Sequence, residues 1–258
     1  MIPKLINYCW FGNGKKNEIF YKCLDSWKKF FPDYKIKEWN ESNFDVNQCE
    51  YSKEAYAAGK YAFVSDYARL KIIYENGGIY FDTDVEVLKN MDYIIKKGAF
   101  IGCELEGSIA TGLGFGAEPK NKMVKEMLDE YREKHFVENG KINSTPCPIY
   151  NTQPFLKSGW NKNESNKVVK VKDIMVYPPN FFSPFNYLTG EVKITEDTYT
   201  YHYGDASWLP EYEKKLFDKK KVLVKKFGKK FGKLIYYIEK FFILLIKNPK
   251  KLIRRVKK

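Results

Sequence analysis

The chain contains few cysteines and few histidines, and this scarcity excludes several kinds of site. Its 258 residues include 5 Cys and 2 His, and no two cysteines form a C-x-x-C pair. The spacing typical of structural zinc sites and of dithiol redox sites is therefore absent. An odd number of widely spaced cysteines indicates a protein that keeps its thiols reduced.

Long apolar runs are also missing. The longest stretch, from Leu234 to Ile246, is interrupted by Glu239 and Lys240 and is too short to span a bilayer. The first residues lack both the apolar core and the small-residue cleavage site of a secretory signal. We therefore expect the folded body of the protein to stay in the cytoplasm.

The first 210 residues carry almost no net charge. The whole chain has a formal charge of +13, but residues 211–258 hold 18 Lys and Arg against 4 Asp and Glu. The remaining 27 basic and 28 acidic side chains belong to residues 1–210. A nucleic-acid-binding domain would spread positive charge over a folded face. The asymmetry instead predicts a catalytic domain over 1–210 and a dedicated basic tail over 211–258.

The tail has the composition of an interfacial membrane anchor. From Lys214 onward, clusters of Lys and Arg alternate with aliphatic and aromatic side chains at helical spacing, as far as the break at Asn248-Pro249. This pattern predicts a basic amphipathic helix that lies on an anionic membrane surface. A solvated charge run is the alternative, but it would lack this much apolar surface. We expect peripheral attachment to the inner face of the cell membrane.

Hydrophobic patterning along the body predicts an α/β fold. Residues 2–10 form an apolar, β-prone run, 17–31 show helical spacing, and 34–39 alternate like a strand. This β-α-β order is typical of a Rossmann-like sheet flanked by helices. Further strands are expected at 99–103, 109–116, 168–177 and 198–203, a helix at about 121–133, and an exposed loop at 161–167.

Two aspartates follow a short buried strand in the middle of this pattern. A helix with a predicted N-cap at Ser65 ends at a Gly-Gly pair, and residues 79–81 then form the strand. Asp82 and Asp84 come at its carboxyl end, and strand alternation sends both side chains to the same side. Both could bind one Mg²⁺ or Mn²⁺ ion that keeps positions for substrate phosphates. An Asp-rich surface turn is the alternative, because D-x-D is common by chance.

Characteristic motifs extend well beyond the aspartate pair. They are IPKLINYCWFG at 2–12, EWN at 38–40, AFVSDYARL at 62–70, YENGGIYFDTDVEVL at 74–88, TGLGFG at 111–116 and H-x4-SW at 202–208. Together they resemble the DXD sugar-binding region of glycosyltransferase family 32 and its capsular polysaccharide synthesis relatives. More distantly, they resemble the glucosylating domains of large clostridial toxins. The resemblance covers roughly residues 1–210 and leaves out the tail.

This resemblance implies a GT-A type fold and a hexosyltransferase. The reaction would be a metal-dependent, retaining transfer of a hexose-type sugar from a nucleotide-sugar donor, with Mn²⁺ or Mg²⁺ as cofactor. The toxin-like relatives favour a UDP-sugar. The implied acceptor is a surface or capsular polysaccharide in bacteria, and a lipid-linked acceptor would give the membrane-binding tail a purpose.

The resemblance also implies roles for individual residues. Asp84 would be the direct metal ligand, and Asp82 would hold the ribose and metal-bound water. Asp66 would bond hydroxyls of the donor sugar, and Arg69 would approach the sugar and diphosphate oxygens. An ion pair within the helix is the alternative for Asp66 and Arg69, which lie three residues apart. The predicted catalytic residues are Asp82, Asp84 and Arg69.

Other positions would complete the site. Trp10 would stack on the nucleobase, with a core tryptophan as the alternative. The glycines of the 111–116 segment do not fit a dinucleotide fingerprint, so its backbone is expected near the sugar or the acceptor. The toxin relatives carry an amide side chain near the reacting carbon where this chain has Ala110. The predicted substrate-binding residues are Trp10, Asp66, Arg69, Tyr80, Asp82, Thr111, Gly112, Ser207 and Trp208.

The late histidine segment is the predicted source of a third metal ligand. His202 follows a β-like run, and the resemblance implies a closing contact to the metal or the diphosphate. Asp205 and Ser207 compete for the same role, and a satisfied structural histidine is the alternative. The predicted metal ligands are Asp82, Asp84 and His202.

Two functions of other classes stay open at this point. A nucleic-acid-binding protein could use the basic tail, with the D-x-D pair as a nuclease-like metal site, but the neutral body argues against a nucleic-acid partner. A non-catalytic adaptor could dock the enzymes of a polysaccharide assembly complex. The presence of Asp66 and Arg69 together with both aspartates of the D-x-D pair argues against such a degenerate protein.

Overall fold

The computed structural model describes residues 1–184, 191–204 and part of the segment 215–238. The chain divides into two compact units. The first consists of Met1–Pro184 and Ile194–Asp205, and the second of Phe185–Lys193 and Ala206–Lys258. The predicted division of function between 1–210 and 211–258 stays a prediction.

A mixed β-sheet forms the centre of the first unit, with seven strands in the part of the chain that the structure describes. The strands in spatial order are β2 (Lys35–Trp39), β1 (Leu5–Cys9), β3 (Gly78–Tyr80), β6 (Phe115–Ala117), β5 (Phe100–Gly102), β10 (Ile174–Tyr177) and β9 (Val169–Val171). β1 pairs in parallel with β2 and β3, and β5 pairs in parallel with β10. β6 and β9 run antiparallel to their neighbours.

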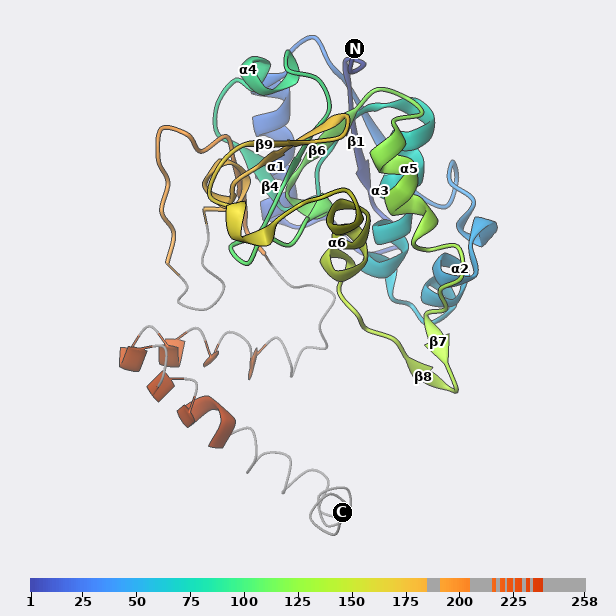
Figure 1. Cartoon of the computed structure of the whole chain (residues 1–258). Helices are drawn as coiled ribbons and strands as arrows, with labels where there is room; N and C mark the ends of the chain where they lie inside the picture. Colours follow the sequence, from blue (N-terminus) through green and yellow to red (C-terminus); the bar gives the residue numbers. More distant parts are fainter. Residues whose placement is uncertain are drawn as a thin grey trace. The chain divides into compact units, whose positions relative to one another are not determined.

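Helices cover both faces of this sheet, as Figure 1 shows for α1 on one side and α3 and α5 on the other. One face carries α1 (Glu18–Phe30), α4 (Asp92–Ile95), α7 (Pro179–Phe182) and the strand β4 (Val85–Val87). The other carries α2 (Glu50–Ala57), α3 (Tyr61–Asn76), α5 (Lys122–Asp129) and α6 (Cys147–Lys157). The predicted α/β class, a mixed sheet flanked by helices, is confirmed.

Helix α1 shows how the sequence determines one of these layers. The Asn17 side chain accepts a hydrogen bond from the Phe20 amide at 2.9 Å and caps the first turn. Phe20, Cys23 and Trp27 recur at helical spacing and are almost fully buried. The indole of Trp27 donates to the Val85 carbonyl at 2.8 Å. The helix is thereby attached to β4, the strand that follows the aspartate pair.

The end of α3 was predicted correctly, but its start was not. The helix begins at Tyr61, one turn before the predicted N-cap, and the hydroxyl of Ser65 donates to the Tyr61 carbonyl at 3.1 Å inside the helix. Packing sets the start, because Phe63 and Val64 already belong to the buried face. At the other end Gly77 has a φ of 66°, a conformation that glycine adopts without a steric penalty.

Several later elements differ from the predicted strands. Residues 111–113 of the predicted strand 109–116 form a 3₁₀ turn, η2 (Thr111–Leu113), and only the end of the segment enters β6. The predicted strand 168–177 is a hairpin, β9–β10, which turns where Lys172 has a φ of 51°. The helix expected at 121–133 ends at Asp129. The loop 161–167 contains the short 3₁₀ helix η3 (Lys162–Glu164).

The predicted strand 198–203 contributes to a separate small sheet. β11 (Thr200–His202) pairs antiparallel with β4 and not with the central sheet. A hairpin of β7 (Val137–Glu138) and β8 (Lys141–Ile142) and the 3₁₀ helix η1 (Val46–Gln48) complete the described elements of the first unit.

The second unit contains the basic tail. Its described residues between 215 and 238 are helical, and apolar side chains such as Phe231 and Leu234 are more than half exposed. None of the helices among the described residues combines the length and the apolar character needed to cross a membrane. The predicted break at Asn248-Pro249 lies outside the described residues.

Candidate functional site

Asp82 and Asp84 lie in the turn that connects β3 to β4. The turn closes through a hydrogen bond from the Val85 amide to the Asp82 carbonyl at 3.0 Å. Phe81 and Val85 on its two sides are fully buried, so the core fixes the turn while the two carboxylates are left partly exposed. The pair therefore sits at the carboxyl end of a buried strand, as predicted, where ligands of α/β sheets commonly bind.

His202 reaches this pair from β11, the neighbouring strand of the small sheet. In the β4–β11 ladder His202 lies opposite Val85, and its Nε2 atom is 3.1 Å from Oδ1 of Asp84. One ligand atom from each of Asp82, Asp84 and His202 lies within 4.8 Å of the other two. Two carboxylates and an imidazole are suitable ligands for one divalent cation. The three predicted metal ligands are thus brought together.

Arg69 lies behind Asp82 and is 3% exposed. Its Nη1 atom is 3.1 Å and 3.2 Å from the two carboxylate oxygens of Asp82, and its Nη2 atom forms an ion pair with Asp66. The intrahelical ion pair expected as an alternative is therefore present, and the same guanidinium also reaches the D-x-D turn. Burial alone would lower the pKa of Arg69, but the Asp82 carboxylate raises it, so the side chain stays charged.

Gly112 packs directly against this ion pair. A Cβ atom at Gly112 would lie 2.3 Å from Oδ2 of Asp82 and 3.0 Å from Nη1 of Arg69. No side chain fits there unless one of these groups moves. The Asp82 amide also donates to the Gly112 carbonyl at 3.4 Å. The backbone of the 3₁₀ turn η2 therefore packs directly against the Asp82 carboxylate.

Two of the predicted substrate-binding residues are buried in the interior. Thr111 is fully buried, and its hydroxyl accepts a hydrogen bond from Nδ2 of Asn151 at 3.0 Å. Tyr80 is 1% exposed, and the centre of its ring lies 5.6 Å from Cζ of Arg69. In this structure both side chains pack around the site and not on its open side.

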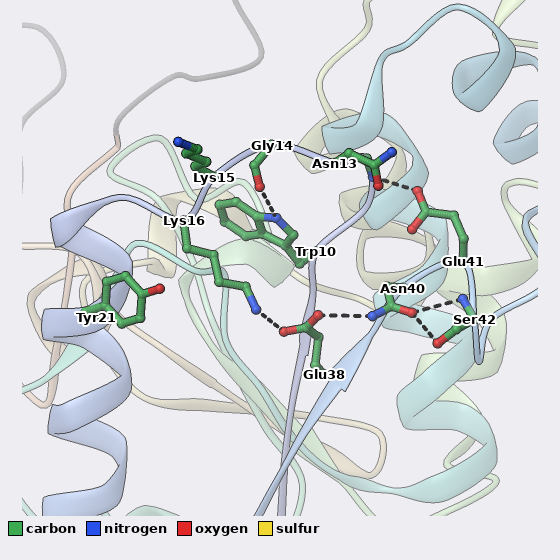
Figure 2. A pocket seen from close by; sticks show the side chains of 11 residues that line it. Trp10, Asn13, Gly14, Lys15, Lys16, Tyr21, Glu38, Asn40, Glu41 and Ser42 are labelled. Atoms are coloured by element: carbon green, nitrogen blue, oxygen red, sulfur yellow. Dashed lines mark hydrogen bonds and ion pairs between the residues drawn. The ribbon is translucent and has the colours of Figure 1, made fainter.

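Trp10 lines a pocket of about 740 Å³ where β1 and β2 end (Figure 2). The indole is partly exposed, and its N–H donates to the Gly14 carbonyl at 3.1 Å. The pocket is lined by Trp10, Gly12, Asn13, Gly14, Lys15, Lys16, Tyr21, Glu38, Asn40, Glu41 and Ser42. It combines one large aromatic face with many polar groups, which suits a planar ring that carries hydrogen-bonding edges.

Glu38 makes several polar contacts within this pocket. It pairs with Lys16 and accepts a hydrogen bond from Nδ2 of Asn40 at 3.0 Å (Figure 2). It also accepts one from the Tyr8 hydroxyl at 2.7 Å. Burial alone would raise the pKa of Glu38, but the hydrogen bonds from Lys16 and Tyr8 lower it. Neither Glu38 nor Lys16 was predicted as a site residue. The only sequence clue was the EWN motif at the end of the predicted strand 34–39.

Glu104 is a further acidic group that the sequence did not single out. It follows β5 at the same edge of the sheet as Asp82, because β5 and β3 both run antiparallel to β6. Burial raises the pKa of Glu104, and the nearby His202 opposes that shift. Its position after the predicted strand 99–103 was the one clue available. Of the remaining predicted residues, Asp205, Ser207 and Trp208 lie outside the described residues.

Comparison with known proteins gives this geometry a context. Residues 17–101 match the family described as glycosyltransferase sugar-binding region containing DXD motif, a segment that includes Asp66, Arg69, Asp82 and Asp84. A curated relative, inositol phosphoceramide mannosyltransferase 1 of Schizosaccharomyces pombe (strain 972), is 26% identical over 206 residues. The alignment covers 74% of this chain and 61% of the relative, so the chain spans less than two thirds of that protein.

Two solved structures are also similar. PaToxG glycosyltransferase shares 22% sequence identity at a TM-score of 0.46, over 60% of this chain and 69% of its own. A glycosyltransferase involved in the glycosylation of the major capsid of PBCV-1 shares 12% identity at a TM-score of 0.47, over 84% and 99%. Neither likeness is close enough to assign a role to a residue. The family match and the curated relative confirm the predicted resemblance to DXD glycosyltransferases, and with it the predicted enzyme class.

Proposed function

We propose that this chain is a metal-dependent glycosyltransferase that transfers a hexose-type sugar from a nucleotide-sugar donor, with retention of anomeric configuration. The observation that carries the proposal is the convergence of Asp82, Asp84 and His202, whose ligand atoms lie within 4.8 Å of one another at the carboxyl edge of the sheet. The D-x-D pair belongs to a segment that matches a sugar-binding family. A surface turn with two chance aspartates would not explain the approach of an imidazole from a strand far along the chain.

Of the two predicted cofactors, Mn²⁺ fits the three side chains better than Mg²⁺ does. Mg²⁺ favours oxygen ligands in nearly ideal octahedral geometry, whereas Mn²⁺ accepts carboxylates and tolerates an imidazole more readily. When bound, such an ion stabilises the negative charge that develops on a departing diphosphate. Asp84 and His202 would bind it directly, and Asp82 would bind it or the waters around it.

Arg69 is proposed to act by holding Asp82. Its guanidinium bonds both oxygens of that carboxylate and is almost fully buried. Such a pair holds the Asp82 carboxylate in one orientation before substrate arrives, which is the preorganisation that catalysis requires. Asp66, which is itself buried, pairs with the other terminal nitrogen of the guanidinium, and it would bond hydroxyls of the donor sugar.

The donor nucleoside is proposed to bind the pocket beside Trp10, with UDP preferred over GDP. Stacking of a base on an aromatic side chain stabilises binding by about 1–3 kcal/mol. We therefore expect Trp10→Ala to raise the donor KM about tenfold or more with a smaller change in kcat, and Trp10→Phe to restore most of the affinity. Steady-state kinetics with varied donor measures both. An unchanged donor KM in Trp10→Ala would contradict binding of the base in this pocket.

The acceptor is proposed to be a lipid-linked surface or capsular polysaccharide, reached from the inner face of the cell membrane. The curated relative is named for inositol phosphoceramide, a membrane lipid, which supports a lipid-borne acceptor. The tail supports it too, because residues 211–258 hold 18 basic side chains and its described apolar residues are largely exposed.

The role of the tail can be tested by co-sedimentation. The full chain should sediment with vesicles of phosphatidylglycerol and phosphatidylcholine, much less with phosphatidylcholine alone, and binding should fall sharply when residues 214–258 are deleted. Duplex DNA in a parallel experiment at two salt concentrations separates lipid from nucleic-acid binding. Equal sedimentation of the truncated and full chains would contradict the membrane proposal.

The enzymatic proposal is tested by thermal denaturation with a panel of UDP- and GDP-sugars, each with Mn²⁺ or with EDTA. A ligand that binds only the folded chain raises the melting temperature. We expect a shift that needs both the metal and one class of donor, accompanied by slow donor hydrolysis. The Asp84→Ala variant should lose both effects. A non-catalytic adaptor would show neither in the unmodified chain.

A further inference from the structure

Three side chains from three separate elements meet beside the small β4–β11 sheet. Nζ of Lys22, from α1, lies 2.5 Å from the hydroxyl of Tyr203 and 3.0 Å from Oε2 of Glu86. The Tyr203 hydroxyl donates to the same Glu86 oxygen at 2.6 Å. We call these three residues the Tyr203 clasp. It joins α1, β4 and the residue that directly follows β11.

The clasp is satisfied in charge and in hydrogen bonding. The hydrogen bond with Tyr203 and that with Glu86 both raise the pKa of Lys22, so the ammonium group stays charged. The Tyr203 hydroxyl uses its proton in the bond to Glu86 and accepts from the Lys22 ammonium. A hydrogen bond to a charged group is stronger than one between neutral groups.

The position of the clasp matters because β11 is short and carries His202. The strand has three residues, and a slip of one residue would turn the imidazole to the opposite face of the sheet. At one end, the fully buried Thr200 donates from its hydroxyl to the Phe182 carbonyl at 3.0 Å. At the other end, the Tyr203 amide donates to the Asp84 carbonyl at 3.0 Å.

We propose that Tyr203 is a positioning residue for metal binding: through the clasp it fixes the register of β11, so that His202 stays beside Asp84. The inference rests on the proposed metal-dependent function and adds a residue to it. Outer groups that orient a metal ligand commonly contribute about 10- to 100-fold to metal affinity. The hydroxyl of Tyr203, bonded 2.6 Å from Glu86, is such a group.

A positioning role of the clasp can be distinguished experimentally from a purely electrostatic effect of Glu86 on cation binding. Glu86 lies on β4, two residues beyond Asp84 of the preceding turn. If its carboxylate only influenced the local potential, removal of the Lys22 ammonium would leave more negative charge near the site and strengthen cation binding. If the clasp holds the strand, Lys22→Met weakens binding. The two accounts therefore predict changes of opposite sign.

The experiment measures Mn²⁺ binding to the full-length chain by the loss of the free Mn²⁺ signal in electron paramagnetic resonance. We expect Tyr203→Phe to weaken binding about tenfold and Lys22→Met to weaken it in the same direction. The matched controls are Tyr93→Phe on α4 and Lys97→Met just beyond that helix, where Nζ of Lys97 lies 2.6 Å from the Tyr93 hydroxyl. These controls remove the same kind of bond and should bind Mn²⁺ as the unchanged chain does.

A double-mutant comparison tests whether Tyr203 acts through His202. In a His202→Ala background, the Tyr203→Phe change should cause no further loss of Mn²⁺ affinity, because the group that it positions is gone. A further loss of the same size would refute the positioning role, even if the hydroxyl also contributes to stability. The melting temperature without metal, recorded for every variant, reports that separate contribution.

The outcomes distinguish the two proposals. If the unchanged chain binds no Mn²⁺, the proposed function fails, and the inference built on it fails too. If the unchanged chain binds Mn²⁺ and Tyr203→Phe binds it equally well, the clasp is refuted while the proposed function stands. Tighter binding by Lys22→Met would also refute the clasp, because the charge account predicts that result.

Discussion

Asp82 and Asp84 are separated by one residue, yet different parts of the molecule hold them. Asp82 is held from the inside, by the buried guanidinium of Arg69 and the close backbone of Gly112. Asp84 is held from the outside, through the β4–β11 ladder and the contact with His202. A metal site with independent supports can lose one half of its geometry while the other half survives. The predictions below test that division.

The largest effect is expected at the two carboxylates themselves. Asp84→Ala should abolish transfer, a loss of about a thousandfold or more if the ion supplies several kcal/mol of transition-state stabilisation, and should leave the melting temperature without metal nearly unchanged. Asp82→Ala should cost as much activity and also lower that melting temperature, because it removes one partner of the buried Arg69. Near-normal turnover with saturating donor in either variant would refute the site.

The next largest effect is expected on stability, from loss of the buried Arg69 side chain that pairs with Asp82. Arg69→Met leaves Asp66 and Asp82 close together without their shared cation, and breaking a buried pair in this way typically destabilises a protein by about 3–5 kcal/mol. Urea denaturation measures the change. The control is Lys71→Met on the same helix, where Nζ lies 2.7 Å from Oε1 of Glu75. Such an i,i+4 pair, here partly exposed, contributes about 0.3–0.5 kcal/mol, so equal losses in the two variants would contradict a special role for the Arg69 pair.

The smallest effect is expected from a change at Gly112, whose backbone packs against Asp82. Gly112→Ala places a methyl group where the Asp82 carboxylate lies, 2.3 Å from Oδ2, and overpacking of this kind costs about 1–3 kcal/mol. We expect a modest fall in stability together with weaker Mn²⁺ binding. Gly14→Ala is the stability control, because a Cβ there has no atom within 4 Å. If Gly112→Ala unfolds at the same urea concentration as the unchanged chain and binds Mn²⁺ equally well, the close packing of Gly112 is not needed to position Asp82.

The parts of the site that follow local rules could be predicted from the sequence. The helix stop at Gly77, the buried strand after it and the turn with both aspartates depend on residues next to one another. The placement of His202 came from a resemblance, since a strand pairing across the chain leaves no local pattern. The bounds of α1 were also predicted closely, because the helical spacing of apolar residues starts at Asn17 and Pro32 follows the end of the helix.

Features that depend on distant packing could not be predicted. Ser65 has the chemistry of an N-cap, yet the buried face of α3 extends past it, and packing prevailed over capping. The strand expected at 109–116 breaks into a 3₁₀ turn because Gly112 must approach Asp82, which lies 30 positions earlier in the sequence. The bonds between Lys16 and Glu38 and within the Tyr203 clasp join side chains of ordinary surface type. Such residues give no sign of their partners before the fold is known.

The long connection across the small sheet has a consequence for how the protein matures. Tyr203 and Glu86 are 117 positions apart, so a ribosome must finish most of the first unit before β11 can dock on β4. Contacts of such separation form late, because loop closure must come first. A nascent chain therefore holds both aspartates well before it gains the imidazole. In the proposed metal site, the third ligand is therefore added as one of the last events of synthesis.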